Sequence, residues 1–423
     1  MRWTAKRRLL ATPAVRVALI LWPMVAWYGF TQRMEHLPET PWQGAGQVSP
    51  ILAFLAPACA GVAAWEGRRA TVGLVTGRAP VRSRLRIAVA ALWPVLVMGW
   101  GGLVTGVTVV VHQAGNVALP PVTVLTMWAV MLVGFTAGGY VLGRALPHAG
   151  GLALVVVVSW VVVAYPPAMT PYWLRHLTGG GMTVCCVVDA EIAAEARLAP
   201  ALLALGVAAA AVLLIHTGRR VLPLVTALIP VAVGLGGAVV LVRDMEAVPE
   251  GPRAEGLRCE GTAPELCLWP EQEPHRERLD DRFSEAYAAL TAVGVEVPPR
   301  IGNQRWDPGV TYLPLSVEPS SEDVAQALPK ALLPSEPPEC AWRAGGAFPG
   351  GDAYPVLEAW LTIVVGGDPA GPEQAGYFEP RDVELARRVA ELPAPEQHLW
   401  FTHNRTALDD CTTEPLLDVP ATD

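Results

Sequence analysis

The sequence predicts an α-helical polytopic membrane bundle followed by a small α+β extracytoplasmic domain. Three observations predict it: uncharged apolar runs such as LALVVVVSWVVVAY before residue 243, an abrupt rise in charge after it, and a clustering of cysteines in the segments between or after the runs. Of the 423 residues, 52% are hydrophobic and only 17% are charged, which is too apolar for a soluble chain of this length. The apolar residues are therefore expected to lie in a lipid bilayer.

The apolar runs are long enough to be transmembrane helices. A helix needs about 20 mostly apolar residues to cross the hydrocarbon core, because its backbone polar groups must be satisfied internally. We count about seven such runs, with six as the alternative because only HTGRR separates the last two. They lie at residues 14–31, 49–66, 87–111, 122–142, 152–169, 199–216 and 221–242. This gives a transmembrane domain at 1–242, a linker and domain entry at 243–262, and an acidic domain at 263–423.

Charge divides the chain and predicts its orientation. Residues 1–242 contain 17 Lys and Arg against 6 Asp and Glu, whereas residues 243–423 contain 14 against 33, so the halves carry +11 and −19 and sum to −8. Short loops rich in Lys and Arg remain cytoplasmic. The basic segments precede spans one, three, five and seven. They share one side only if the N-terminus is cytoplasmic and an odd number of spans precedes the tail. We therefore predict a multi-pass plasma-membrane protein with an extracytoplasmic C-terminal domain.

Cysteine positions agree with this orientation. Cys59 lies within the second span, and the other six cysteines lie in segments that the charge rule places outside. Thiols in an oxidising compartment form disulfides. We favour Cys259 with Cys267 and Cys340 with Cys411, and we leave Cys185 and Cys186 unassigned. The alternative is that some of these thiols are reduced and buried.

The tail is predicted to contain both helices and strands. Its clearest element is a helix at 275–294, in which apolar residues recur at helical spacing and Gly294 suits the C-terminal cap. Further helices are expected at 321–331, 354–365, 380–392 and 396–409, and strands at 296–301 and 310–317.

Residues for chemistry are scarce. Ion-coupled transporters place carboxylates or histidines at membrane depth, but Arg16, Glu66, His112 and His216 all lie near span ends. His398 and His403 do not form an HExxH motif, and the chain lacks a G-x-S-x-G sequence and a phosphate-binding loop. We therefore predict neither an enzyme nor a self-powered transporter, and we expect no cofactor, no metal and no nucleic acid.

The loop after the second span is the most informative segment. It reads WEGRRATVGLVTGRAPVRSRLR and contains the candidate docking residues Glu66, Arg68, Arg69, Arg78, Arg82, Arg84 and Arg86. One interpretation is a short interfacial helix that docks on a cytoplasmic partner. The other is a basic loop that sets the topology and lies against anionic lipid headgroups.

A family resemblance bears on this loop. The phrase AAWEGRR followed by APVRSRLRIAVAAL, together with spans that lack internal charges, resembles the permease subunits of type-2 ABC exporters, particularly actinobacterial ones. The resemblance covers roughly residues 1–242. It implies that residues 66–86 contact a separately encoded ABC-type ATPase and that the chain forms a homodimer or a heterodimer with another permease. The chain departs from that family in its count of seven spans rather than six and in its large external domain. The alternative function is a membrane-anchored extracytoplasmic binding or sensory protein.

Overall fold

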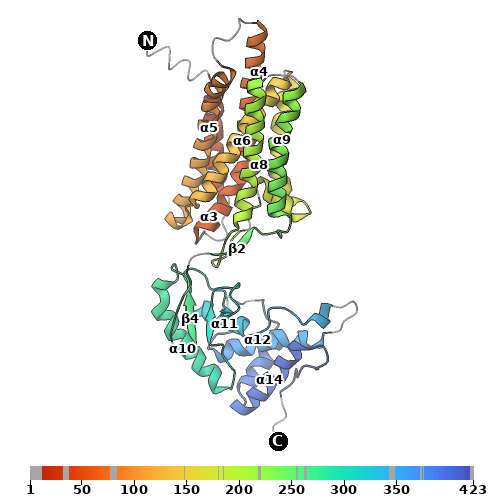
Figure 1. Ribbon diagram of the computed structural model, residues 1–423. Coiled ribbons are helices and arrows are strands. Elements are labelled where there is room, and N and C mark those ends of the chain that lie inside the picture. Colours follow the sequence, from red (N-terminus) through yellow and green to blue (C-terminus); the bar gives the residue numbers. More distant parts are fainter. Residues whose placement is uncertain are drawn as a thin grey trace. The chain divides into compact units, whose positions relative to one another are not determined.

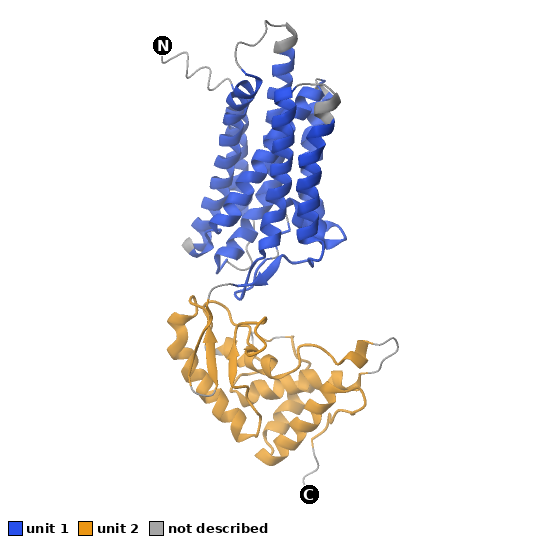
Figure 2. Ribbon diagram, viewed as in Figure 1, with its two compact units in different colours: residues 1–253 blue, residues 254–423 orange. Residues whose placement is uncertain are grey.

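The protein forms two compact units, Met1–Arg253 and Ala254–Asp423, each with its own hydrophobic core (Figure 2). The computed structural model describes residues 12–31, 38–76, 83–146, 148–179, 181–183, 185–217, 221–253, 256–261, 264–342, 348–371, 374 and 376–419. The first unit is a helical bundle, and the second combines short strands with helices (Figure 1).

The first unit is built from long apolar helices. In chain order they are α2 (Pro13–Thr31), α3 (Pro41–Val48), α4 (Leu52–Thr76), α5 (Arg84–Ala114), α6 (Val122–Ala145), α7 (Ala149–Ala164), α8 (Ala194–Thr217) and α9 (Val221–Val242). Within the described residues, six segments are long and apolar enough to cross a membrane; one of them runs from Pro41 through a 3-10 turn to Val72. Residues 199–216 and 221–242, which could have formed one broken span, are two separate helices.

The expected fifth span, 152–169, is shorter than the sequence suggests. It corresponds to α7, whose 16 residues extend only ~24 Å, against a hydrocarbon core of ~30 Å. The helix ends before Pro166 and Pro167, because proline lacks the backbone N–H that would continue the helical hydrogen bonds. The chain continues as 3-10 turns η3 (Pro166–Ala168) and η4 (Tyr172–Thr178). The seven expected spans are therefore six full-length helices and one short helix.

Helix α6 packs closely against both α4 and α8. A Cβ atom on Gly143 or Gly139 would collide with the backbone of Ala64 or Ala60 in α4, and one on Gly134 would contact Ala204 of α8. Such close backbone approach is how membrane helices gain van der Waals contact. The small residues of α6 therefore serve packing within the chain.

The bundle has two chemically different ends. Strand β1 (Ala190–Ile192), which follows α7, pairs with β2 (Glu250–Pro252), which follows α9. Between the same two segments, Arg175 Nη1 donates to Ala247 O at 3.1 Å, and His176 Nε2 lies 2.7 Å from Glu246 O. Helix α7 therefore carries the chain across the bundle despite its length. We call this the tail end, and we call the opposite end, where α4 stops and α5 starts, the arginine end.

The second unit has a small mixed sheet. Strands β3 (Arg258–Glu260), β4 (Glu265–Leu268), β5 (Arg300–Gly302) and β6 (Thr311–Tyr312) lie in that order; β3 and β4 are antiparallel and the other pairs are parallel. The strands expected at 296–301 and 310–317 are thus only two or three residues long. The segment expected to be a linker, 243–262, contains β2 and β3.

The helices of the second unit begin and end within two residues of the expected positions. They are α10 (Arg276–Ala292), α11 (Ser321–Leu332), α12 (Ala353–Val364), α13 (Pro380–Ala390) and α14 (Ala394–Asp409). Helix α11 starts with a capping box, in which Ser320 Oγ accepts from Asp323 N and Asp323 Oδ2 accepts from Ser320 N. Helix α12 is the centre of the core, because Trp360 is fully buried against Trp400 and Phe401 of α14.

Two disulfides link elements of the second unit. Cys259 and Cys267 face each other across β3 and β4, and Cys340 is joined to Cys411, which follows α14. These are the two pairings that the sequence favours. In the first unit, the structure joins the unassigned pair Cys185 and Cys186 to each other.

Candidate functional site

The arginine end holds the described members of the predicted docking set. Glu66 pairs with Arg69 at 3.1 Å, and the guanidinium of Arg68 lies 5.9 Å from the ring centroid of Trp65. Arg84 and Arg86 are exposed in the first turn of α5, where Ser83 Oγ caps the helix by accepting from Arg86 N. Arg78 and Arg82 lie outside the described residues.

Helix α4 extends past its neighbours at this end (Figure 1). Gly67 lies close against α6, because a Cβ atom there would collide with the carbonyl oxygen of Tyr140. Beyond Gly67 the helix continues to Thr76, with Arg69 and Val72 exposed. The projecting turns thus present cationic and apolar side chains, which suit either an acidic protein surface or anionic headgroups. The arginines are recognisable in the sequence, whereas the close packing at Gly67 is indicated there only by its spacing from Ala60 and Ala64.

Charged groups lie near the helix ends. In the described helices α2 to α9, the Asp, Glu, Lys, Arg and His residues lie in the terminal turns, or at Glu66 and beyond it in α4. The central turns of these described helices therefore hold no ionisable side chain of the kind that ion-coupled transporters place at membrane depth.

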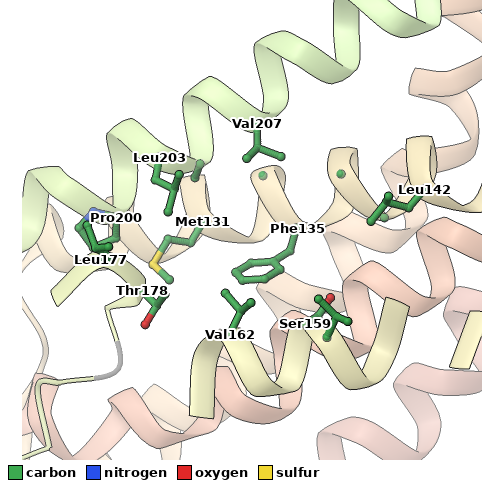
Figure 3. Close-up of a pocket in the computed structure, with 15 residues that line it drawn as sticks. Met131, Phe135, Leu142, Ser159, Val162, Leu177, Thr178, Pro200, Leu203 and Val207 are labelled. Carbon is green, nitrogen blue, oxygen red and sulfur yellow. The ribbon is translucent and has the colours of Figure 1, made fainter. Parts of the chain in front are cut away.

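The first unit contains an apolar cavity of about 220 Å³ between α6, α7 and α8, bounded by η4 (Figure 3). The lining comes from Met131, Gly134, Phe135, Gly138, Gly139, Leu142, Val158, Ser159, Val162, Leu177, Thr178, Pro200, Leu203, Ala204 and Val207. It contains two hydroxyl groups: Ser159 Oγ donates to Val155 O at 2.7 Å, and Thr178 Oγ1 is buried without a hydrogen-bond partner. The cavity can therefore hold a mainly apolar ligand.

The adjacent cysteines at the tail end have a carboxylate neighbour. The sulfur atoms of Cys185 and Cys186 and a carboxylate oxygen of Glu250 all lie within 4.8 Å of one another. Both sulfurs are joined in a disulfide, so neither is a thiolate that could bind a metal ion. Glu250 Oε1 instead accepts from the backbone N–H of Val187 at 3.3 Å.

The most deeply buried carboxylate among the described residues of the second unit is that of Glu358 in α12. Its side chain is only 4% exposed, with Lys330 Nζ 3.7 Å from Oε1 and the Tyr377 hydroxyl donating to Oε2 at 3.1 Å. Burial raises the pKa of Glu358, and Lys330 opposes that shift. Burial and the neighbouring carboxylate raise the pKa of Tyr377 to about 12. Sequence analysis missed this cluster; its only signal was a glutamate in the otherwise apolar run AYPVLEAWLTIV.

Comparison with known protein families gives a match only for a region within the second unit. Residues 266–411 match a domain of unknown function, DUF7224. The match runs from β4 to Cys411, so the DUF7224 region contains Glu358, Lys330 and Tyr377 and also the Cys340–Cys411 disulfide. No match to this chain was found among curated proteins or solved structures.

Proposed function

We propose that this polytopic membrane protein is a non-catalytic, permease-like subunit of an ABC transport system, powered by a separate ATPase. The observation that carries the proposal is the arginine end, where α4 projects beyond Gly67 and the exposed Arg84 and Arg86 begin α5. A projecting cationic helix suits docking on an acidic cytoplasmic surface. Because the described helix interiors lack ion-coupling groups, the energy for transport would come from that partner.

The charge at the two ends supports an orientation with the arginine end in the cytoplasm. Among the described residues, the arginine end carries six cations against the single acid Glu66: Arg16, Arg68, Arg69, Arg84, Arg86 and Arg144. The tail end carries four arginines against seven acids: Glu39, Asp189, Glu191, Glu195, Asp244, Glu246 and Glu250. This asymmetry favours a cytoplasmic arginine end. The disulfides of the second unit are compatible with an extracytoplasmic tail.

Neutralising the arginine end tests the docking role. Arg68, Arg69, Arg84 and Arg86 are changed together to Gln, and the full-length protein is purified with an ABC ATPase encoded beside it. We expect the ATPase to be lost from the purified complex, because the cations that attract it are gone. The matched control changes four exposed arginines of the second unit to Gln: Arg300, Arg381, Arg387 and Arg388.

Correct insertion is verified separately by thiol labelling of intact cells. Asp280→Cys should react with an impermeant reagent and Val75→Cys should not, with the same result in the neutralised background. Retention of a verified ATPase partner by the neutralised protein would discard the docking role and leave the headgroup interpretation. Labelling of Val75→Cys from outside would overturn the orientation.

The second candidate function is a membrane-anchored extracytoplasmic binding or sensory protein. The observation that favours it is the DUF7224 region itself, a separate compact unit with a carboxylate buried beneath Lys330 and Tyr377. Deletion of residues 254–423 distinguishes the two functions. A permease-like subunit would still bind its ATPase and insert in the membrane, whereas a sensor would lose its response to an external ligand.

A further inference from the structure

We propose that the cavity between α6, α7 and α8 binds one fatty-acyl chain of an ester-linked membrane lipid. The inference goes beyond the proposed function, because it concerns binding by the bundle alone and holds with or without an ATPase. Three properties of the cavity carry it: its length and apolar lining, its exposed rim, and one unpaired hydroxyl group.

The lining has the length of an acyl chain in one leaflet. Along α6 it runs from Met131 to Leu142, about 16 Å at the rise of an α-helix. One leaflet of the hydrocarbon core is about 15 Å deep, half of the ~30 Å core. Phe135 lies across the middle of the cavity, between α7 and α8 (Figure 3). A narrow apolar space of this length suits an extended hydrocarbon chain better than a compact polar solute.

The rim of the cavity faces the surface of the bundle. Leu142, Val158 and Val162 line it and are 45%, 47% and 40% exposed. The deeper lining residues Met131 and Leu177 are buried. Exposed apolar side chains on a membrane helix contact lipid. The cavity therefore opens sideways, toward acyl chains.

Thr178 supplies the polar contact. It is 8% exposed, lines the cavity from η4, and its Oγ1 has no hydrogen-bond partner. A buried unpaired hydroxyl is unfavourable, so an acceptor on a ligand would satisfy it. Helix η4 also carries Tyr172 and Trp173, residue types that gather where acyl chains meet headgroups. The ester carbonyl of a lipid lies at that boundary. We therefore place the carbonyl at Thr178 and the chain along α6 toward Leu142.

Photolabelling tests the site directly. The full-length protein is reconstituted in bilayers that contain a phospholipid with a photoreactive group in its ester-linked chain, and labelled residues are mapped by mass spectrometry. We expect the label to concentrate on the cavity-lining turns of α6, α7 and α8, and Val162→Trp to remove most of it by filling the mouth. The matched control is Val161→Trp, which lies on the same helix, is 42% exposed and does not line the cavity.

A second pair of variants tests the hydroxyl without adding bulk. Thr178→Val keeps the shape of the side chain and should reduce specific labelling about two- to tenfold, the effect of one net hydrogen bond. Ser159→Ala should leave labelling unchanged, because that hydroxyl is already bonded to Val155 O. Label spread evenly over all exposed apolar helices, or equal loss in Val161→Trp and Val162→Trp, would overturn the proposal. So would unchanged labelling in Thr178→Val. None of these outcomes depends on the ATPase, so they are distinct from failure of the proposed function.

Discussion

Glu358 is held in a site that disfavours its charge. It lies on α12, the helix at the centre of the core of the second unit. Its carboxylate oxygens contact the Lys330 ammonium and the Tyr377 hydroxyl. The Lys330 ammonium also lies 4.7 Å from the Tyr377 ring centroid. Both residues are more exposed than Glu358, whose side chain is only 4% exposed. Burial outweighs the attraction of Lys330, and the pKa of Glu358 is raised.

This shift predicts how stability changes with pH. The folded domain retains the Glu358 proton to higher pH than the unfolded chain, whose ordinary pKa is 4.5. The resulting stabilisation is fully present below that value and is lost as pH rises through the folded pKa. Glu358→Gln keeps the size and the oxygen acceptor but does not ionise. We expect the free energy of unfolding to fall less steeply above pH 4.5 in the variant than in the wild type. Parallel curves in chemical denaturation across that range would contradict the assignment.

At the residue scale, the sequence predicts local partners better than distant ones. The short Cys259–Cys267 loop could be inferred because eight positions separate the two cysteines. Glu358, Lys330 and Tyr377 come from three different segments, and no pattern in the sequence predicts that they lie in contact. The sequence likewise does not predict that the Thr178 hydroxyl lines a cavity, because the cavity forms only where η4 lies against α6, α7 and α8.

Among the elements, α6 packs against its neighbours with no space for an added Cβ atom at Gly143 or Gly139. A Cβ atom on Gly143 would collide with backbone atoms of Ala64. Backbone atoms cannot rotate out of the way as the end of a flexible side chain can. Gly143→Ala should therefore separate α4 from α6 and destabilise the bundle by about 1–3 kcal/mol, the usual effect of overpacking. Gly150→Ala in α7 is the control, because a Cβ atom there meets no other atom within 4 Å. Thermal unfolding of the two variants in detergent should show a loss for Gly143→Ala alone. Equal melting temperatures would mean that the helices can move apart freely.

The lengths of the elements were less predictable than their existence. Hydropathy alone counted 152–169 as a full span, yet Pro166 and Pro167 end α7 after Ala164. Hydropathy also placed the end of the second span at residue 66, whereas α4 continues through Arg68 and Arg69 to Thr76. At the end of α7, the two prolines rather than side-chain polarity determine where the helix stops. The ends of the five helices in the second unit were easier to predict, because amphipathic spacing and capping residues mark them.

On the scale of the whole molecule, the chain joins two units stabilised by different means. The first buries small residues between long apolar helices, and the second has a core of its own but carries most of the acidic charge. Self-repulsion among like charges disfavours a compact state. The disulfides of the second unit oppose that tendency, and they differ in how much chain they close. Cys340 and Cys411 are 71 positions apart, whereas Cys259 and Cys267 are 8 apart.

The longer disulfide should therefore contribute more to stability. In the loop-closure description, a crosslink over 71 residues removes denatured-state entropy worth about 4 kcal/mol, and one over 8 residues about 2.5 kcal/mol. The longer loop also contains α12, α13 and α14, including Trp360 and Trp400, whereas the shorter one closes a strand pair already joined by backbone pairing. We expect Cys340→Ser to lower the denaturation midpoint of oxidised residues 254–423 more than Cys259→Ser does. Equal midpoints, or recovery of Cys340 crosslinked to any cysteine other than Cys411, would show that the longer disulfide does not hold this core together.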